Sequence, residues 1–537
     1  MCKAPLEDLS SGAVADLGGA SQSTSQTDVY RLFRNRTSAL PTSIAIEDAG
    51  DQITYANLLS RVDQLAGHFV GLGLKAGERI AILSRNRREY IEVELAAAAT
   101  GLILACLNWR LLATELCHCI NLVSPRLIIA EPDLQGLLDQ TPDIATLALG
   151  HEYEDALIQA GQFVPVPQDP ESGLVILYTS GTTGLPKGAV VSHRAMIARA
   201  MTFATELGLS PNDGFVAWAP MFHMASTDHA LATLLRGGTV VVIDGYDPDA
   251  ICRSVETHHI GWLVLIPGMI EPLIAHIKAQ GITPKGIRVC GAMADLVPPR
   301  QISEITTLLN APYLNSFGST ETGLPPATRA TIPISVAPEN LSKQISAFCE
   351  IRLVDETGED VSVGAPGELL MRGPTLFSGY WDADGANKTA FRNGWYHMGD
   401  MFRRNADGTL DFADRAKYLI KTGGENVYPT EIERVLMADP NVTDAAVVRV
   451  PDDRWGEAPV AFVSRSCNAP TRDTLMAACR ASLAAYKLPR KIHFIAFEDF
   501  PRSTSGKILR HILEASLRDD QGSSSSGSPT PGNGLRP

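Results

Sequence analysis

The chain has 537 residues, 45% hydrophobic and 20% charged, which is enough apolar material for a large core and several subdomains. Its formal net charge of −14 argues against general nucleic-acid binding, which needs a basic surface, although a local site can still bind an anion. The longest uncharged stretch, residues 95–109, is shorter than the roughly 20 apolar residues of a membrane-spanning helix. Composition therefore predicts a soluble globular protein with no transmembrane segment.

The N-terminus and the cysteines bear on where the protein works. The start, MCKAPLEDLSSGAVADLGG, lacks the continuous apolar stretch of a secretory signal, so we expect a cytoplasmic protein. The nine cysteines are scattered, which favours reduced thiols. Cys117 and Cys119 flank His118, but three such ligands on one short stretch cannot close a tetrahedral metal site. We expect them to pack within a helix instead.

Helical and strand patterns alternate through the first 300 residues. Residues 54–73 space their apolar side chains at helical intervals, and the strand-like RIAILS follows. The same rhythm recurs at the short apolar runs RLIIAEP, GLVILYTSG and WLVLIPG. The pattern predicts a large α/β domain with mainly parallel sheets.

From about residue 352 the pattern changes to short strands and glycine-containing turns, among them a hairpin signal at Asp407 and Gly408. This predicts a small β-rich subdomain. Beyond Asp414 a stretch of about 100 residues mixes helix and strand, enough for a separate small domain. The final QGSSSSGSPTPGNGLRP has the composition of a disordered tail.

The most informative motif is TSGTTGLPKG at residues 179–188, between the apolar strand LVILY and a helix that Ser192 is expected to cap. Its glycines let the backbone approach a ligand, its hydroxyls donate, and Lys187 adds a cation. It is not a Walker loop, because Pro186 precedes Lys187 and Gly188 stands where Ser or Thr is required. A flexible surface turn fits the composition but not this ordered run after a buried strand. We predict a phosphate-binding loop.

At this loop the chain resembles the adenylate-forming superfamily of acyl-CoA synthetases, luciferases and peptide-synthetase adenylation domains. The resemblance runs from about residue 54 to residue 513, with NSFGSTETG, GWYHMGD, DRAK, KTGGENVYP and PRSTSGKILR in the family's order. It implies a large N-terminal α/β domain with a β-rich subdomain, then a small mobile α+β domain. With the hinge at Lys417, we expect a flexible N-terminus at 1–27, the large domain at 28–416, the small domain at 417–516 and a disordered tail at 517–537.

The resemblance also implies an ATP site. Thr320 would contact the α-phosphate and Glu321 would help to hold Mg²⁺, roles that suit a hydroxyl donor and a hard carboxylate ligand. Asp400 and Arg415 would bind the ribose hydroxyls. Alone, these residues could cap a turn or be solvated loop charges. The other implied nucleotide-binding residues are Thr179, Ser180, Gly181, Thr182, Thr183, Gly184, Lys187, Gly291, Ala292, Ser316, Phe317 and Gly318.

Two further segments resemble the parts that the family uses in turn. Lys507 matches the lysine that enters the site for adenylation, where an ammonium stabilises charge on the phosphate oxygens. It could also be an exposed lysine before an amphipathic helix. After domain rotation about the hinge, Lys421, Gly423, Gly424 and Glu425 would line the channel for the thiol arm of CoA, since glycines let it pass close to the backbone.

The acid-binding residues are less specific. His223 stands where the family often has an aromatic residue or histidine beside the acyl group, with a catalytic or pocket role, but it could equally be a satisfied core histidine. The same resemblance suggests the neighbouring pocket residues Met224, Ala225, Ser226, Gly291, Ala292 and Gly318. Aryl, fatty and polycyclic acids are all compatible with this set.

Four positions depart from the family pattern. Phe317 replaces the usual tyrosine, Met398 replaces a threonine, and Cys290 and Met293 flank the Gly291 turn. Each lost hydrogen bond would cost about 1 kcal/mol, which would slow adenylation rather than abolish it.

The sequence therefore predicts an ATP-dependent acid–CoA ligase that forms an acyl-adenylate and uses Mg²⁺, as a monomer or homodimer. Three alternatives stay open: a thioester-only enzyme fed preformed acyl-adenylate, an enzyme that loads a carrier-protein thiol, and luciferase-like oxidation. A non-catalytic binding protein is disfavoured, because the motifs together cover the phosphate, metal, ribose and catalytic roles.

Overall fold

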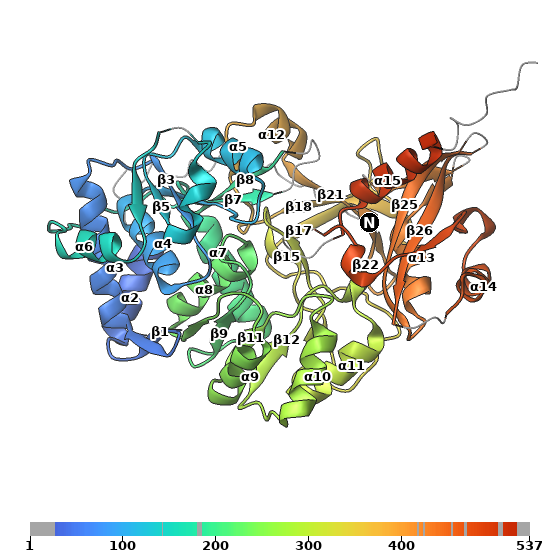
Figure 1. Cartoon of the computed structure of the whole chain (residues 1–537), viewed down its shortest axis with the longest axis horizontal. Helices are drawn as coiled ribbons and strands as arrows, with labels where there is room; N and C mark the ends of the chain where they lie inside the picture. Colours follow the sequence, from blue (N-terminus) through green and yellow to red (C-terminus); the bar gives the residue numbers. More distant parts are fainter. Residues whose placement is uncertain are drawn as a thin grey trace, which may run out of the picture.

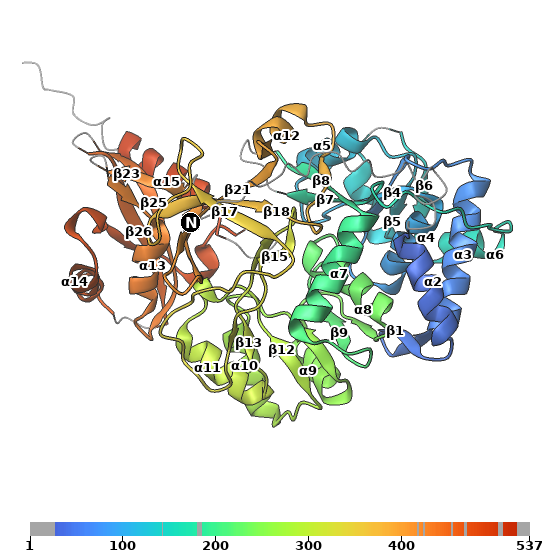
Figure 2. The ribbon, with the colours of Figure 1, turned by 180° about the vertical axis from the view of Figure 1, so that it is seen from behind.

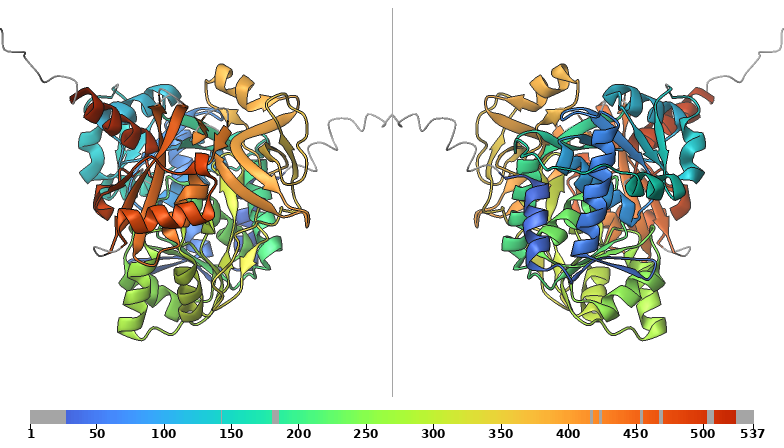
Figure 3. Two further views of the ribbon diagram at one scale, coloured as in Figure 1. Left: turned by 90° about the vertical axis from the view of Figure 1, so that its right-hand side faces the viewer. Right: turned by 90° about the vertical axis from the view of Figure 1, so that its left-hand side faces the viewer.

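The computed structural model describes residues 27–141, 143–179, 185–415, 418–422, 425–452, 455–466, 470–502 and 508–523. The large N-terminal part, blue to yellow in Figure 1, lies beside a smaller C-terminal part in orange and red. The view from behind in Figure 2 and the end views in Figure 3 agree that the first helices and the C-terminal part occupy opposite ends of the molecule. The predicted fold class is confirmed.

Two sheets form the centre of the large domain, and most of their neighbouring strands are parallel. The first has the order β16 (Thr331–Ile332), β13 (Tyr313–Leu314), β12 (Ile287–Cys290), β11 (Ile260–Leu263), β9 (Gly214–Ala217), β10 (Val240–Val242), β1 (Ile44–Asp48) and β2 (Asp51–Thr54). The second has the order β19 (Gly379–Tyr380), β8 (Lys187–Ser192), β7 (Gly173–Thr179), β4 (Ile103–Cys106), β3 (Arg79–Leu83), β5 (Ile128–Ala130) and β6 (Thr146–Ala148).

Helices cover these sheets and carry one continuous apolar core between them. They are α2 (Val29–Ala39), α3 (Tyr55–Gly71), α4 (Arg88–Thr100), α5 (Ala113–Val123), α6 (His151–Ile158), α7 (His193–Leu207), α8 (Met224–Arg236), α9 (Pro248–Thr257), α10 (Ile270–Gln280) and α11 (Pro299–Leu309). The predicted cap of α7 is confirmed: the Ser192 hydroxyl accepts from the Ala195 amide at 3.2 Å.

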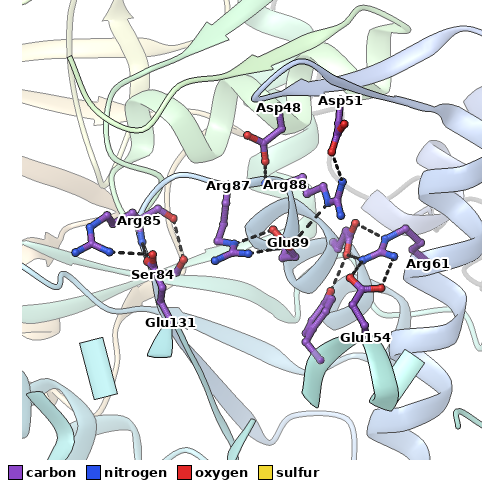
Figure 4. Close-up of polar contacts among 12 residues, drawn as sticks. Asp48, Asp51, Arg61, Ser84, Arg85, Arg87, Arg88, Glu89, Glu131 and Glu154 are labelled. Carbon is purple, nitrogen blue, oxygen red and sulfur yellow. Dashed lines mark hydrogen bonds and ion pairs between the residues drawn. The ribbon is translucent and has the colours of Figure 1, made fainter. Parts of the chain in front are cut away.

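The most buried of these helices, α4, takes two of its three glutamates, Glu89 and Glu92, into the interior as ion pairs (Figure 4). Arg87 binds Glu89 at 2.8 Å, and Arg61 binds Glu92 at 2.7 Å and also Glu154. Pairing of this kind is what makes a buried carboxylate tolerable. It leaves the rest of the α4 surface free to pack between the two sheets.

The β-rich subdomain consists of the sheet β17 (Glu350–Val354), β18 (Pro366–Arg372), β21 (Trp395–Arg404), β20 (Phe391–Arg392) and β22 (Leu410–Arg415), with α12 (Asp384–Ala390) at its edge. The hairpin predicted at Asp407 and Gly408 joins β21 to β22. A separate short hairpin, β14 (Phe317–Ser319) and β15 (Gly323–Ala327), links this subdomain to the first sheet.

The C-terminal part has its own sheet and apolar core. Its strands are β23 (Ile420–Thr422), β24 (Glu425–Val427), β25 (Val442–Asp452), β26 (Gly456–Arg465) and β27 (Ile492–Phe494), and its helices are α13 (Pro429–Met437), α14 (Arg472–Ser482) and α15 (Arg510–Ser523). Ala416 and Lys417 lie outside the described residues, so the hinge stays a prediction.

Two details correct the sequence analysis. The sequence predicts a phosphate loop at residues 179–188 ahead of the helix capped by Ser192, but residues 187–192 form strand β8, antiparallel to β7. The tail was expected to begin at residue 517, but α15 continues to Ser523, because the buried Leu517 packs in an apolar cluster with Leu513 and Phe500. No helix among the described residues is long and apolar enough to cross a membrane.

Candidate active site

Three segments far apart in the sequence meet at the predicted magnesium ligand. Glu321 is 9% exposed, and its Oε1 accepts a hydrogen bond from the Tyr380 hydroxyl at 2.8 Å. The ammonium of Lys187, at the end of the phosphate loop, lies 4.8 Å from the centre of the Tyr380 ring. A carboxylate and a cation that share one tyrosine are suited to a metal ion and the polyphosphate that it accompanies.

Strand pairing explains why Lys187 and Tyr380 meet. β7 and β8 form an antiparallel hairpin in which Thr179 is the register partner of Lys187. The loop residues Ser180 to Gly184 lie between them, outside the described residues. On its other side β8 pairs with β19, which places Tyr380 opposite Ala189. Tyr396, which is next to Tyr380, has a pKa raised well above the ordinary value, by burial and then by the Glu321 charge.

The turn that carries Thr320 and Glu321 joins β14 to β15 and is held through its backbone. The Arg199 guanidinium on α7 donates to the Thr320 carbonyl at 3.0 Å and to the Thr375 carbonyl at 3.0 Å, and it pairs with Asp228 on α8 at 2.9 Å. The side chains of Arg199 and Asp228 are only 4% and 2% exposed. This buried ion pair therefore fixes the turn relative to both helices.

The Glu321 side of the turn has its own support. The Phe377 amide donates to the Glu321 carbonyl at 2.8 Å. Gly323 has a φ of +75°, and a Cβ there would come within 2.9 Å of the Arg199 side chain. A glycine is thus required for the strand to leave the turn past the guanidinium. Neither Arg199 nor Phe377 was singled out in the sequence, because an arginine inside an amphipathic helix has the pattern of a solvated residue.

Gly291 and Gly318 occupy positions that no other residue can take without rearrangement. Gly291 has a φ of +80°, and a Cβ there would lie 2.3 Å from the Tyr313 ring. A Cβ on Gly318 would lie 2.0 Å from the Gly323 carbonyl oxygen. The Gly291 carbonyl accepts from the Trp262 indole N–H at 2.6 Å, which helps to fix the turn. The next residue, Ala292, is half-buried. The tight turn is retained despite Cys290 and Met293.

A buried lysine braces the segment before Ser316. Lys343 is fully buried, and its Nζ donates to Asn315 Oδ1 at 2.6 Å and to Asp295. Asn315 in turn accepts from the Ala294 amide at 3.3 Å. The turn at 291–295 and the strand that leads to the Thr320 turn are therefore tied together. A lysine in the loop segment KQISAF carries no sequence signal for this role.

The predicted ribose pair sits on one hairpin. Asp400 in β21 and Arg415 in β22 are direct register partners, and Asp400 is 3% exposed. For Arg415 only the backbone is described. Directly opposed residues of an antiparallel pair are close neighbours, so the two residues can act on one ligand.

Two departures from the family pattern lie in apolar surroundings. The Phe317 ring is 5% exposed and packs against Phe402 at 4.7 Å and Phe412 at 5.3 Å. Met398 packs partly buried beside the same cluster. Core packing thus explains the apolar side chains of Phe317 and Met398.

Among the predicted acyl-pocket residues at the start of α8, His223 and Ser226 already make hydrogen bonds, whereas Met224 and Ala225 are apolar. The Nδ1 of His223 accepts from the Ala225 amide at 3.2 Å, so this histidine is the N-cap of α8. Ser226 is fully buried, and its hydroxyl donates to the Ala219 carbonyl at 2.6 Å. Met224 is 7% exposed and belongs to the core. Ala225 is half-buried. The alternative of a satisfied histidine at position 223 thus has direct support.

The predicted thiol-channel residues lie on the β23 and β24 hairpin. Lys421 is exposed; its amide donates to Glu457 at 2.8 Å and its ammonium lies 3.4 Å from Glu356, an exposed residue of the β-rich subdomain. Glu425 is described only as backbone, paired with Thr422. Gly423, Gly424 and Lys507, the predicted adenylation lysine, lie outside the described residues. The cysteines 117 and 119 pack in α5 as expected, and the His118 Nε2 lies 3.1 Å from the Pro186 carbonyl oxygen, at the end of the phosphate loop.

Comparison with known proteins decides the family. A model of AMP-binding enzymes matches residues 33–381, and a model of the AMP-binding enzyme C-terminal domain matches residues 431–507. The chain belongs to the AMP-binding enzyme family.

A feruloyl-CoA synthase from Amycolatopsis sp is 31% identical over 483 residues, covering 88% of this chain and 95% of that protein. A 2-succinylbenzoate–CoA ligase from Bacillus cereus is 30% identical over 473 residues, covering 88% and 95%. The ATP-bound structure of MatB from Rhodopseudomonas palustris superposes with a TM-score of 0.80 at 26% identity, covering 92% of this chain and 100% of that one. The predicted enzyme class, an AMP-forming acid–thiol ligase, is confirmed.

Proposed function

We propose that this enzyme converts a carboxylic acid, ATP and CoA into acyl-CoA, AMP and pyrophosphate through an acyl-adenylate, with its own residues in the roles that the motifs predict. The observation that carries the proposal is the meeting of Lys187, Tyr380 and Glu321 beside the clamped Thr320 turn. This places a cation, a hydroxyl and a carboxylate where a polyphosphate and its metal ion would need them.

The residues at this point suit Mg²⁺. Glu321 offers a hard carboxylate oxygen, is held by the Tyr380 hydroxyl, and stands on a turn whose two carbonyls are fixed by Arg199 and Phe377. Mg²⁺ bound here would neutralise charge on the phosphate oxygens. Lys187 would add a second positive charge on the same side.

In the first half-reaction the acid's carboxylate attacks the α-phosphorus and pyrophosphate leaves. Thr320 would donate to an α-phosphate oxygen, Asp400 would accept from the ribose hydroxyls, and Lys507 would stabilise the developing charge. Clamping of the turn by Arg199 means that the Thr320 hydroxyl starts from a fixed backbone. Such positioning lowers the barrier without any further contact to substrate.

In the second half-reaction the thiolate of the acceptor attacks the acyl carbonyl and AMP leaves. We propose CoA as the acceptor and the loop that begins at Lys421 as the channel wall, reached by rotation about Lys417. The exposed contacts of Lys421 support this, because they can be exchanged at little cost. The domain boundary at Lys417, with a large domain at 28–416 and a small domain that continues through α15 to Ser523, is part of the same proposal, as is a cytoplasmic location.

The choice of carboxylic acid depends on the size and polarity of the acyl pocket. The relatives quoted above are named for ferulate and 2-succinylbenzoate. Their resemblance supports a carboxylic acid of that size.

Pyrophosphate exchange with a panel of acids, run beside CoA capture of a synthetic acyl-adenylate, tests the proposal. We expect acid-dependent exchange and thioester formation in the same preparation. Thioester formation without exchange from any acid would overturn the two-step assignment in favour of a thioester-only enzyme. Transfer to a carrier-protein thiol in preference to CoA would overturn the choice of acceptor.

A further inference from the structure

A small cavity with both polar and apolar lining lies behind the Thr320 turn, between α7, α8 and β15. Its lining residues are Arg199, Thr202, Phe203, Asp228, His229, Ala232, Leu324, Pro325 and Thr328. The cavity measures about 10 Å³, which is about the space that one water-sized group needs. Arg199 is shared with the clamp on the Thr320 carbonyl, so the cavity adjoins the candidate active site.

Two buried side chains in this cavity have polar atoms without a partner among the described residues. His229 is 4% exposed, and neither of its ring nitrogens makes a hydrogen bond. The Asp228 Oδ1 is also unpaired, while its Oδ2 is used by Arg199. Buried polar atoms are costly to leave unsatisfied. A ligand with the right polar group would remove that cost.

The geometry of α8 connects this cavity to the predicted acyl pocket. Ala225, His229 and Ala232 are spaced by four and three residues, so they lie on one face of the helix. His229 is therefore about 6 Å farther along the helix axis than Ala225. On the opposite side, the His229 ring lies 4.4 Å from the Trp262 ring, and Trp262 is bonded to the Gly291 carbonyl. His229 thus follows Ala225 on one side of the predicted pocket and contacts Trp262, the hydrogen-bond partner of Gly291, on the other side.

The surroundings of His229 are aromatic. Its ring meets Phe203 at 4.4 Å and Trp262 at 4.4 Å, both edge to face, and Phe215 at 5.8 Å. Burial lowers the pKa of His229 to about 3, so the imidazole is neutral, with one N–H donor and one acceptor nitrogen. A neutral imidazole beside a carboxylate oxygen can satisfy a hydroxyl in both directions.

We propose that this cavity is the far end of the acid site and selects an aryl carboxylic acid whose distal end carries a neutral hydroxyl group. The inference rests on the proposed function and adds a substrate class to it. The hydroxyl donates to Asp228 Oδ1 or to the acceptor nitrogen of His229, and it accepts from the His229 N–H. The ring of the acid lies between Ala225 and the indole of Trp262.

Charge and polarity disfavour the other acid classes. A second carboxylate would meet the buried Asp228 carboxylate, and Arg199, the cation in the cavity lining, already pairs with Asp228. Three of the five N–H donors of Arg199 are already used, by Thr320, Thr375 and Asp228. An alkyl tail would leave the His229 and Asp228 atoms buried and unpaired, which is the basis on which hydrogen-bonding sites reject analogues.

The test uses two acyl-sulfamoyl adenosines as stable analogues of the acyl-adenylate, one built from 4-hydroxycinnamic acid and one from cinnamic acid. Their dissociation constants are measured by calorimetry on the full chain, so the result does not depend on turnover. We expect the hydroxylated analogue to bind at least tenfold more tightly. A ratio below twofold would overturn the inference.

Variants show whether His229 causes the preference. In His229→Leu the ratio should fall toward one, and in His229→Gln, which keeps a donor and an acceptor, most of it should remain. His151→Leu, on the exposed start of α6, is the matched control and should keep the wild-type ratio. An unchanged preference in folded His229→Leu would overturn the inference. If the cavity holds only a water, both analogues should bind His229→Leu more weakly by the same factor, and the unchanged ratio would overturn the inference. Absence of pyrophosphate exchange with every acid would contradict the proposed function but leave this binding ratio to decide the subsite.

Discussion

In the proposed reaction the Thr320 turn would serve the first half and the Lys421 hairpin the second, and the two segments are held in opposite ways. The turn is fixed by a buried ion pair between Arg199 and Asp228 and by hydrogen bonds to both of its carbonyls. The hairpin is tied to the β-rich subdomain by Lys421 and Glu356, with side chains 65% and 89% exposed. One arrangement is preorganised and the other is exchangeable.

The difference follows what each half-reaction needs. Phosphoryl chemistry depends on groups that are already in place as charge develops. Delivery of a thiol requires an element that can move, and elements that move have few buried contacts. Four changes would break or sharpen this comparison.

The largest effect is expected from Lys507→Ala. Removing the ammonium should lower acid-dependent pyrophosphate exchange by about 10² to 10³-fold, because the charge on the phosphate oxygens loses a stabilising cation. Thioester formation from preformed acyl-adenylate should be largely spared. The two rates are measured on the same preparation, and equal losses in both would contradict the division of labour.

Arg199→Met should come next. It leaves the Asp228 carboxylate buried without its cation, so the free energy of unfolding should fall by about 3 to 5 kcal/mol in urea titration. Arg199→Lys keeps a charge but loses the fork that reaches Thr320 and Thr375. It should show reduced exchange and a higher Mg²⁺ requirement with a smaller loss of stability. A Mg²⁺ requirement equal to that of wild type would mean that the clamp is only structural.

Acid should destabilise the protein through its buried neutral histidines. Burial lowers the pKa of His193 to about 4 and that of His229 to about 3, whereas the unfolded value is near 6.5. The unfolded chain then binds more protons below pH 6.5, so stability is present above that pH and is lost as pH falls toward the folded pKa. Each histidine should cost about 2 kcal/mol between pH 6.5 and pH 5. His229→Leu should show a shallower dependence; an unchanged slope would contradict the assignment.

Lys421→Ala should have the smallest effect on stability. Its ion pair with Glu356 is exposed at both ends, so the free energy of unfolding should change by less than about 0.5 kcal/mol. Glu356→Ala is the matched control for loss of the pair. A thioester rate reduced in Lys421→Ala but not in Glu356→Ala would identify a role in thiol delivery. A large loss of stability would mean that the hairpin is not exchangeable.

Local patterns carried much of the fold. Helical spacing located α3, the apolar runs located β3, β5, β7 and β11, and Ser192 marked the start of α7. Strand β8 was missed because its short run KGAVVS adjoins a glycine-rich loop that hides its hairpin with β7, and its other partner, β19, lies almost 200 residues away. Pairing at that separation leaves no periodic signal in either segment.

The site divides in the same way. Candidate residues such as Glu321, Asp400 and Lys187 could be predicted from the order of their motifs along the chain, and their roles stay predictions. Arg199, Lys343 and His229 could not, because their roles depend on which carbonyls and cavities the tertiary fold brings to them. A buried charged residue looks like a surface residue until its partners are known.

The β7 and β8 hairpin has one more consequence. In a Walker-type loop the phosphates face the start of a helix, whose aligned peptide dipoles supply positive potential. Here the next helix, α7, begins only after the whole of β8. If the polyphosphate binds at this loop as proposed, side-chain charges such as that of Lys187 would supply positive potential in place of a helix start. Discrete surface charges are screened by ions, so nucleotide affinity should weaken as ionic strength rises.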